Sequence, residues 1–278
     1  MADLWMLYPQ GKLKALTLSY DDGVEQDIRL MEIMNRHGLK GTFNLNSGLF
    51  APEGTTYPEG HIHRRMTEKA VLDLYAGSGH EVAIHALYHG DLPNIPATHA
   101  IWQVMRDKEK LENLFHCIVR GMAYPYGTVT PELAKTLKDC GVAYSRTVES
   151  THRFDLPHNW LQLPATCHHN DPQLMELARR FAEAQPYKPM LFYLWGHSYE
   201  FEANDNWHVI EEFAEYIGGR EEIWYATNIE ICDYIQAWRS MHISADGRRV
   251  YNPTAQNLWL RYNGKDICIE SGYEVLLG

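Results

Sequence analysis

Short apolar runs alternate with amphipathic segments along most of the 278-residue chain. Apolar runs of about four to eight residues predict buried strands, and apolar residues at a spacing of about three to four predict helices. We expect strands at residues 13–19, 41–45, 81–84, 121–124, 142–147, 189–195 and 222–226, and helices beginning near residues 24, 67, 97, 131, 172, 207 and 228. Such alternation predicts a parallel sheet that closes, or nearly closes, into a (β/α) barrel.

The pattern changes near the C-terminus, where hairpin-type turns such as Asn263-Gly264 separate short apolar runs. We therefore divide the chain into a barrel over residues 1–241 and a short β-rich appendage over residues 242–278 that packs on the barrel. Two long irregular stretches, residues 51–66 and 149–169, are expected to be loops that wall a substrate site.

Charge and cysteine usage narrow the partners and the compartment. The chain has 25 Lys plus Arg against 36 Asp plus Glu, a net charge of −11, which disfavours nucleic acid and anionic membranes. It shows no long apolar run and no signal-peptide pattern at its start, and its five cysteines lack CxxC spacing. We therefore expect a cytoplasmic protein, whereas the oligomeric state is not predicted.

Titratable residues follow several of the predicted strands. Asp21 and Asp22 end the first strand, and adjacent carboxylates there need a cation or a proton nearby, although one of them could simply cap the next helix. His85 and His89 follow another strand at a spacing that suits one metal ion, although 15 histidines make this spacing common by chance. His197 follows a third strand. Because the carboxyl ends of barrel strands form one rim, we expect these side chains to meet.

These residues, in this order, resemble the motifs of a known family. Ser19-Tyr20-Asp21-Asp22-Gly23, the His85 and His89 pair, Pro125-Tyr126-Gly127 and His197 are similar to motifs of the polysaccharide deacetylases, carbohydrate esterase family 4. The resemblance spans roughly residues 15–241. It implies a distorted (β/α)7 barrel and a metal-dependent hydrolase that removes acetyl groups from N-acetylated or O-acetylated sugars or oligosaccharides.

The resemblance also implies a role for each matching residue. Asp21 corresponds to the catalytic base, His197 to the general acid, and the backbone N–H of Tyr126 to the oxyanion contact, with a metal-bound water as nucleophile. The implied metal ligands are Asp22, His85 and His89. Two imidazoles and one carboxylate favour Zn²⁺ and also accept Co²⁺, Ni²⁺ or Mn²⁺.

Two departures mark a divergent member. The family arginine that holds the catalytic aspartate is replaced by Ala123, and Arg146, after the next strand, is a substitute by position. The family motif of an aspartate near a tryptophan, which tunes the acid histidine, is matched only by the fragment Asn159-Trp160. The partner of His197 is therefore not identified.

Aromatic residues beside the motifs are candidates for stacking on sugar rings, although core packing explains most such residues. The proposed substrate-binding residues are Tyr88, Pro125, Arg146, Trp160, Trp195 and Tyr199. Cys167, His168 and His169 form another polar group, as do His61 and His63. We interpret both groups as hydrogen-bonding loop walls rather than as a second metal site.

Two other functions stay open. Related barrels open cyclic amides or imides such as allantoin, and the apparent lack of a signal peptide fits a small intracellular substrate. An inactive carbohydrate-binding barrel is suggested by Ala123 and the weak fourth motif. The retained ligands, Asp21 and His197 argue against lost activity, because an unused site has no physical reason to keep them together.

Overall fold

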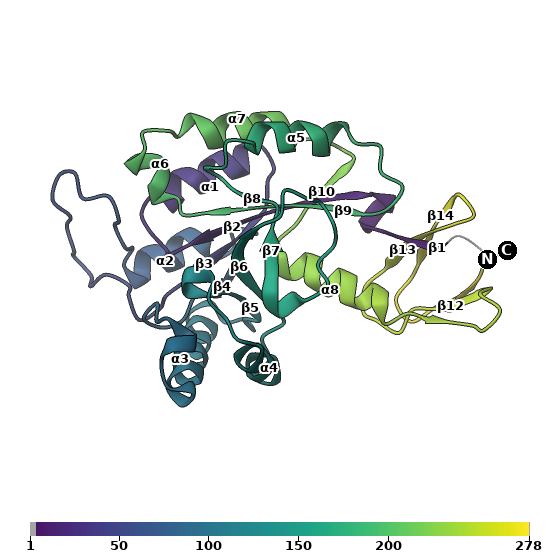
Figure 1. The fold of residues 1–278 in the computed structure, drawn as a ribbon, viewed down its shortest axis with the longest axis horizontal. Coiled ribbons are helices and arrows are strands. Elements are labelled where there is room, and N and C mark those ends of the chain that lie inside the picture. Colours follow the sequence, from purple (N-terminus) through teal and green to yellow (C-terminus); the bar gives the residue numbers. More distant parts are fainter. Residues whose placement is uncertain (1–3, 278) are drawn as a thin grey trace.

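The computed structural model describes residues 4–277 and has a parallel sheet flanked by helices, with small antiparallel sheets at one end (Figure 1). The strands of the large sheet are β2 (Lys14–Asp21), β3 (Gly41–Leu45), β4 (Glu81–Ile84), β5 (Gly121–Ala123), β6 (Tyr144–Ser150), β7 (Leu163–Ala165), β8 (Cys167–His168), β9 (Met190–Gly196) and β10 (Ile223–Tyr225). The helices are α1 (Asp27–Arg36), α2 (Glu68–Tyr75), α3 (Ala97–Phe115), α4 (Pro131–Asp139), α5 (Leu174–Glu183), α6 (Tyr199–Ala203), α7 (His208–Ile217) and α8 (Asn228–Arg239). Every strand and helix expected from the pattern is present, with its predicted ends within three residues of those in the structure.

The large sheet curls until its two edges meet in one segment. Its strand order is β7-β6-β5-β4-β3-β2-β9-β8, with β10 also paired to β2, and every pair is parallel. The first and last strands of this path, β7 and β8, are separated only by Thr166. The N–H of Thr166 donates to the carbonyl oxygen of Tyr193 on β9 (2.8 Å). The N–H of Thr151, directly after β6, donates to the carbonyl oxygen of Ala165 on β7 (3.0 Å). The predicted barrel architecture is confirmed.

The same segment corrects one expectation. Residues 149–169 are not wholly irregular, because they hold the end of β6, strands β7 and β8 and a short 3-10 turn at Trp160–Gln162. Strands of two or three residues that include Pro164 show no periodic pattern. Their extended conformation is set by hydrogen bonds to β6 and β9, which lie far away in the sequence.

Local capping explains why the helix starts follow the sequence so well. The side chains of Thr67, Thr130 and Thr227 accept backbone hydrogen bonds at the starts of α2, α4 and α8. Pro131 occupies the first turn of α4, and Glu230 completes a capping box with Thr227. These are signals of sequence neighbours and need no tertiary contact.

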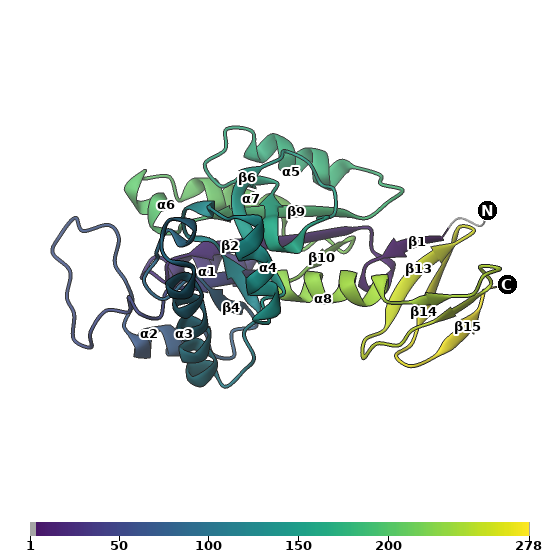
Figure 2. The same ribbon diagram turned by 60° about the horizontal axis from the view of Figure 1, so that its bottom comes forward.

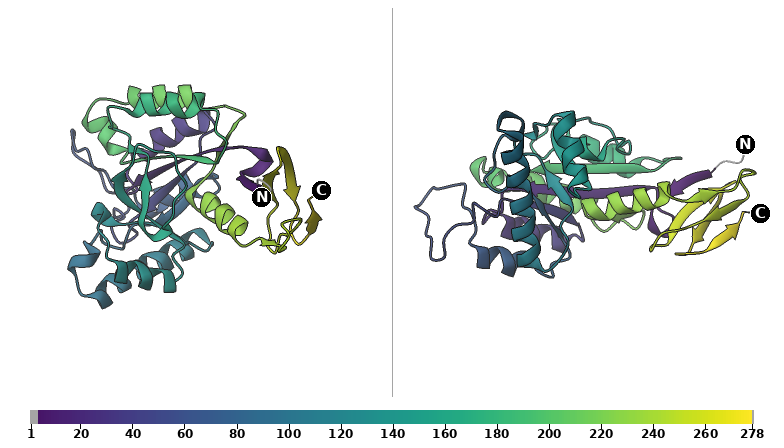
Figure 3. Two further views of the ribbon diagram at one scale, coloured as in Figure 1. Left: turned by 45° about the vertical axis from the view of Figure 1, so that its right-hand side comes forward. Right: turned by 90° about the horizontal axis from the view of Figure 1, so that it is seen from below.

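The helices pack on both sides of the sheet. Helices α1, α5 and α7 lie together on one side and α3 and α4 on the other (Figures 1 and 3). One continuous apolar core includes Leu16 and Leu18 of β2, Phe43 of β3 and Phe192 of β9, all of which are buried. Among residues 4–277, no helix is long and apolar enough to cross a lipid bilayer.

The C-terminal residues form two small antiparallel sheets. One contains β1 (Leu4–Leu7), β13 (Leu258–Tyr262) and β14 (Lys265–Ile269), and the other contains β11 (His242–Ile243), β12 (Arg249–Tyr251) and β15 (Glu274–Leu276). The sequence did not predict that the N-terminal strand β1 would join the first sheet. The sheets lie where β2 begins, at the opposite end of the molecule from the loop of residues 51–66 (Figures 1 and 2). The domain boundary at residue 241 stays a prediction.

Candidate active site

Two adjacent carboxylates at the end of β2 have different surroundings. Asp21 is the last residue of β2, and its Oδ1 accepts a hydrogen bond from Asn44 Nδ2 (2.8 Å). Asp22 takes a left-handed conformation with φ of 89°, so the chain turns sharply after Asp21. Both side chains are buried. The turn separates the two carboxylates and gives each its own partners.

Asp21 is paired with Arg146, a fully buried residue of β6. Arg146 Nη2 donates to Asp21 Oδ2, and the guanidinium lies 4.3 Å from the centroid of the Trp195 ring. Burial acts to raise the pKa of Asp21, but the charge of Arg146, together with the nearby His85 and His197, lowers it below its usual value. The structure thus places Arg146 on Asp21, where the arginine missing at position 123 was expected to act.

Asp22, His85 and His89 bring their ligand atoms within 4.8 Å of one another. His85 Nδ1 lies 2.8 Å from the carbonyl oxygen of Ala123, which can only accept, so the Nδ1 atom carries the ring proton. His85 Nε2 is therefore unprotonated in the neutral ring, and it is buried with no hydrogen-bond partner in the described part of the chain. It lies 4.0 Å from Asp22 Oδ1, as does His89 Nε2.

This donor set fits a divalent metal ion. Metal-binding imidazoles usually donate their second N–H to a carbonyl or carboxylate, as His85 does. Burial lowers the pKa of His85, and burial together with the nearby His85 lowers the pKa of His89 to about 4, so both rings are neutral near pH 7. A buried nitrogen without a partner is costly unless a cation completes it.

Helix α3 holds the loop that carries His85. The carboxylate of Asp107 accepts hydrogen bonds from the backbone N–H of His85 (3.0 Å) and from that of Ser47 (2.8 Å). Asn46 Nδ2 donates to the carbonyl oxygens of His85 and Ala86. The ligand loop is thus fixed by buried groups from α3 and from the end of β3.

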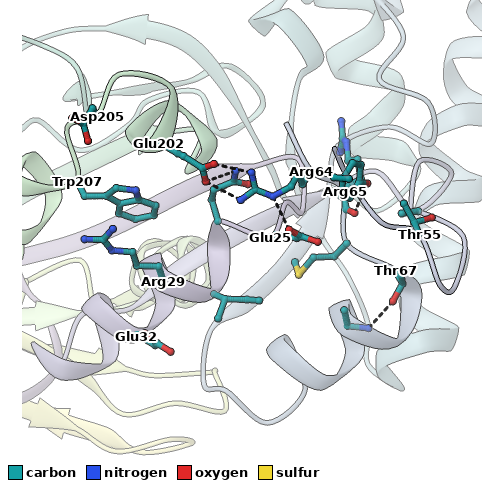
Figure 4. Close-up of a pocket in the computed structure, with 16 residues that line it drawn as sticks. Glu25, Arg29, Glu32, Thr55, Arg64, Arg65, Thr67, Glu202, Asp205 and Trp207 are labelled. Carbon is teal, nitrogen blue, oxygen red and sulfur yellow. Dashed lines mark hydrogen bonds and ion pairs between the residues drawn. The ribbon is translucent and has the colours of Figure 1, made fainter. Parts of the chain in front are cut away.

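The loop of residues 51–66 contributes two contacts that the sequence analysis missed. His63 Nε2 lies 3.0 Å from Asp22 Oδ2, and Arg65 Nη2 donates to Asp22 Oδ1 (3.0 Å). Arg64 anchors the loop by ion pairs with Glu25 and Glu202 at 2.7 Å each (Figure 4). The sequence analysis named His63 only as part of a hydrogen-bonding loop wall with His61, and Arg65 follows no predicted strand, so their contacts with Asp22 were not predicted.

His197 follows directly after β9, and its ring lies close to the Asp21 carboxylate. Its Nε2 lies 3.8 Å from Asp21 Oδ2, and its Nδ1 lies 3.2 Å from Glu200 Oε1. Burial acts to lower the pKa of His197, but the hydrogen bond to Glu200 and the charges of Asp21 and Asp22 raise it above its usual value. Glu200 is the partner that the sequence analysis did not identify. The one available signal was its position, three residues after His197 at the start of α6.

A second cluster of metal-binding residue types has a different proton arrangement. His168 Nε2 and His169 Nε2 lie 3.2 and 2.9 Å from Glu200 Oε2. His168 Nδ1 accepts a hydrogen bond from the backbone N–H of Asn170 (3.1 Å), which leaves the proton of the neutral ring on Nε2. A protonated nitrogen cannot bind a metal. The geometry therefore favours a hydrogen-bonded cluster around Glu200.

Comparison with known proteins relates part of this chain, and its fold, to one family. A profile of the polysaccharide deacetylases matches residues 9–145. Residues 9–145, just under half of the chain, thus resemble the polysaccharide deacetylases as a divergent relative. Members of this carbohydrate esterase family remove acetyl groups from carbohydrates. No curated protein matches the chain significantly.

Solved structures of polysaccharide deacetylases and related esterases share the fold. A presumed polysaccharide deacetylase from Mycobacterium smegmatis is 18% identical with a TM-score of 0.61, over 84% of this chain and 94% of that one. The Xyl-CE4 domain of a xylanase from the hindgut metagenome of Trinervitermes trinervoides is 16% identical, with a TM-score of 0.51, over 81% of this chain and 92% of that one. The family 4 carbohydrate esterase from Streptomyces lividans, solved with acetate, is 14% identical, with a TM-score of 0.50, over 77% of this chain and 92% of that one.

The aromatic residues suggested as substrate contacts, and Tyr126 beside them, differ in accessibility. Tyr88 and Tyr126 are 52% and 62% exposed, and the Tyr126 ring meets His89 edge-on at 4.7 Å. Tyr126 has a φ of 59°, in the left-handed region, within the turn that begins at Pro125. Tyr199 is half-buried beside His197, at 5.4 Å between ring centroids. Tyr126 thus contacts the candidate metal ligand His89, and Tyr199 contacts His197.

Two of the stacking predictions need correction. Trp195 is 8% exposed, and Arg146 covers one face of its ring. Trp160 is also 8% exposed and lines a pocket with residues of α4 and α8, a pocket that includes neither Asp21 nor His197. Neither ring has a free face for a sugar. The Trp195 ring packs between β9 and Arg146 of β6, and the Trp160 ring packs beside α4 and α8.

Proposed function

We propose that this protein is a metal-dependent hydrolase that removes acetyl groups from N-acetylated or O-acetylated sugars or oligosaccharides. The observation that carries the proposal is the position of Asp21 Oδ2. It is paired with Arg146 and lies 3.7 Å from His85 Nε2 and 3.8 Å from His197 Nε2. The Asp21 carboxylate thus lies close both to the candidate metal ligand His85 and to the candidate general acid His197.

Asp21 is suited to act as the general base. Arg146 and Asn44 hold its carboxylate in one orientation and keep it ionised near pH 7. It can therefore accept a proton from a water molecule that attacks the acyl carbon. Its own orientation is fixed by groups that do not take part in the proton transfer.

Asp22, His85 and His89 would hold a divalent ion, with Zn²⁺ favoured by two nitrogen ligands and one oxygen ligand. When bound, such an ion supplies Lewis acidity, which lowers the pKa of a coordinated water and polarises an acyl oxygen. The backbone N–H of Tyr126 is our candidate donor to the oxyanion, since its turn lies against His89.

His197 is suited to act as the general acid. Glu200 accepts from its Nδ1 side, which points Nε2 towards Asp21 and favours the protonated ring. As the bond from the acyl carbon to nitrogen or oxygen breaks and the bond to the water oxygen forms, the Nε2 proton passes to the leaving group. Acetate and the free amine or hydroxyl are the products.

The proposal is tested by acetate release from acetylated chitooligosaccharides and acetylated xylan, with protein loaded with Zn²⁺ or Co²⁺. We expect acetate, and we expect a chelator to stop its release. Hydrolysis of cyclic amides or imides without any release of acetate would contradict the proposal and would support the alternative, a cyclic amide or imide hydrolase. A loaded protein that hydrolyses neither substrate class would support an inactive binding barrel.

We also propose a cytoplasmic location. All five cysteines are free, as in a reducing compartment, although sites such as Cys167 and Cys232 are buried and would stay reduced for that reason alone. Fractionation of the producing cells tests this assignment, and recovery of the native protein outside the cytoplasm would contradict it.

A further inference from the structure

Arg65, in the loop of residues 51–66, is connected to both halves of the candidate metal site. Its Nη2 donates to Asp22 Oδ1 (3.0 Å), and its Nη1 donates to the backbone carbonyl oxygen of Asp22 and to Asn46 Oδ1 (2.8 Å). Asn46 Nδ2 in turn donates to the carbonyl oxygens of His85 and Ala86. A chain of hydrogen bonds therefore runs from Asp22 to the loop that carries His85. We call Arg65 and Asn46 the Arg65–Asn46 link.

The amide of Asn46 is fully used by this arrangement. Its two N–H groups donate to two carbonyl oxygens, which can only accept, and its oxygen accepts from Arg65, which can only donate. Asn46 is also fully buried. Removing Arg65 would therefore leave a buried amide oxygen without this donor, which is costly.

The histidine loop has a backbone that needs support from outside. Ala86 and His89 have φ of 60° and 53°, in the left-handed region that residues other than glycine rarely adopt. Such conformations persist only where the surrounding structure holds them. Asn46 provides two of these contacts, at His85 and at Ala86 itself. The positions of the two imidazoles thus depend on Asn46.

The Asp22 carboxylate is held in one orientation by residues of the 51–66 loop. His63 Nε2 lies 3.0 Å from Oδ2, which leaves Oδ1 on the side of the histidines, 4.0 Å from His85 Nε2 and from His89 Nε2. A carboxylate oxygen has two lone pairs, so Oδ1 can accept from Arg65 and also bind an ion. Carboxylates that bind metals are commonly hydrogen-bonded in this way.

The charge of Arg65 and its hydrogen bonds have opposite effects on metal binding. The guanidinium is always positive, so its charge repels a divalent cation beside Asp22. Its hydrogen bonds, in contrast, fix the ligand in place, and such outer partners typically raise metal affinity about 10–100-fold. The two effects predict opposite results when Arg65 is replaced by a neutral residue.

We propose that Arg65 and Asn46 are positioning residues that set the separation of Asp22 from its two histidine partners. The 51–66 loop, which carries Arg65, thereby determines how tightly the site binds a divalent ion. The inference rests on the metal site of the proposed function and adds residues that act on it indirectly, since Arg65 has no lone pair to offer an ion. The neighbouring Arg64 fixes the loop itself through its ion pairs (Figure 4).

The test is the Zn²⁺ affinity of metal-free protein, measured without substrate by competition with a chromophoric chelator. We expect Arg65→Met to weaken Zn²⁺ binding about tenfold or more. Arg65→Lys keeps the charge but lacks the planar fork that spans Asp22 and Asn46, so it should restore little of the affinity. Arg120→Met is the matched control and should bind Zn²⁺ like the wild-type protein, because Arg120 pairs with Asp233 and lies at the amino end of β5.

A double-mutant cycle tests whether the two residues act as one unit. Asn46→Ala alone is also expected to weaken Zn²⁺ binding about tenfold. Because both side chains belong to one chain of hydrogen bonds, the double variant should lose clearly less than the product of the two single losses. Denaturant titration of each metal-free variant identifies those that fold, and Arg65→Lys, the milder change, carries the test if Arg65→Met does not fold.

Zn²⁺ binding by Arg65→Met that is equal to or tighter than that of the wild-type protein would overturn the proposal, since charge repulsion alone predicts tighter binding. Independent losses that multiply in the double variant would overturn the link. Acetate release, measured in parallel, separates this inference from the proposed function. Wild-type protein that binds Zn²⁺ with the expected loss in Arg65→Met, but releases no acetate, rejects the deacetylase function alone. Acetate release with equal Zn²⁺ affinity in the two proteins rejects the link alone, and wild-type protein that binds no Zn²⁺ rejects the metal site and the link together.

Discussion

The Arg146 guanidinium reaches the Asp21 carboxylate across the barrel, although the two residues are 125 positions apart. Both side chains are almost fully buried. Ala123 is the position at which the resemblance led us to expect an arginine, and in this structure the cation beside the carboxylate comes from β6, the strand that follows.

Replacing Arg146 by Met is expected to lower kcat by about 100-fold or more, since Asp21 loses the group that orients and ionises it. Removing one partner of a buried ion pair also costs about 3–5 kcal/mol of unfolding free energy. Acetate release and denaturant titration measure these two effects. Arg146→Lys keeps the charge but not the planar fork, and we expect it to recover stability more than rate. An unchanged rate in Arg146→Met would remove Arg146 from the account.

Replacing Glu200 by Gln is expected to shift the alkaline limb of the rate profile to lower pH. The carboxylate favours protonated His197, so its removal lowers the pKa of the ring and the acid form is lost earlier as the pH rises. The shift should be on the order of one pH unit. Glu202→Gln, on the same helix but paired with Arg64, is the control and should leave the profile in place. Identical profiles for all three proteins would contradict the role of Glu200.

Metal content distinguishes the two histidine clusters. The wild-type protein is expected to bind one Zn²⁺ per chain, because His85 turns an unprotonated Nε2 towards Asp22, whereas His168 turns its Nε2 proton towards Glu200. His85→Ala should lose most of this metal after dialysis, since one of three ligands is missing. His168→Ala should keep it, because the proton of that ring faces Glu200. Elemental analysis measures the content, and two ions per chain, or loss in His168→Ala, would contradict the assignment.

Asp27 is expected to make the protein less stable as the pH rises. It is fully buried, and burial raises its pKa to about 7, although Ser198, Tyr75 and the N–H of Val24 donate to it. In the native state Asp27 keeps a proton that the unfolded chain releases near pH 4. The contribution of this proton to the unfolding free energy is therefore complete below pH 4 and is lost as the pH rises from 4 to 7.

The measurement compares unfolding free energy at pH 5 and pH 8. Asp27→Asn is neutral at both pH values, so the difference between them should shrink by about 2.7 kcal/mol, because two pH units, from 5 to 7, each count about 1.4 kcal/mol. Asp73→Asn is a matched control, because Asp73 is exposed and its ion pair is with the exposed Lys69. An equal pH dependence in the wild-type protein and Asp27→Asn would show that Asp27 does not titrate in this range.

The sequence predicted the elements because their signals are local. Caps such as Thr130 and apolar runs such as residues 41–45 act through near neighbours. Strands β7 and β8 escaped prediction because their conformation depends on hydrogen bonds to distant strands. The meeting of Asp22, His85 and His89 followed from one rule, that strands of a barrel end on a common rim.

Other parts of the site depend on contacts that no spacing encodes. His63 and Arg65 reach Asp22 from an irregular loop, and that loop is held in place by ion pairs of Arg64. Trp195 and Trp160 were chosen for their positions near motifs, but exposure depends on what packs over a ring. Glu200 shows the intermediate case, since its spacing from His197 was visible but its side-chain direction was not.

The central claim is that Asp21 transfers the proton while Asp22, with the two histidines, holds the ion. The most direct test is a parallel measurement of acetate release and zinc content in wild-type protein and Asp21→Asn. We expect the variant to keep about one Zn²⁺ per chain and to lose nearly all acetate release, with roughly a 1,000-fold drop in rate. Loss of the metal from Asp21→Asn, or acetate release at the wild-type rate, would contradict this division of roles.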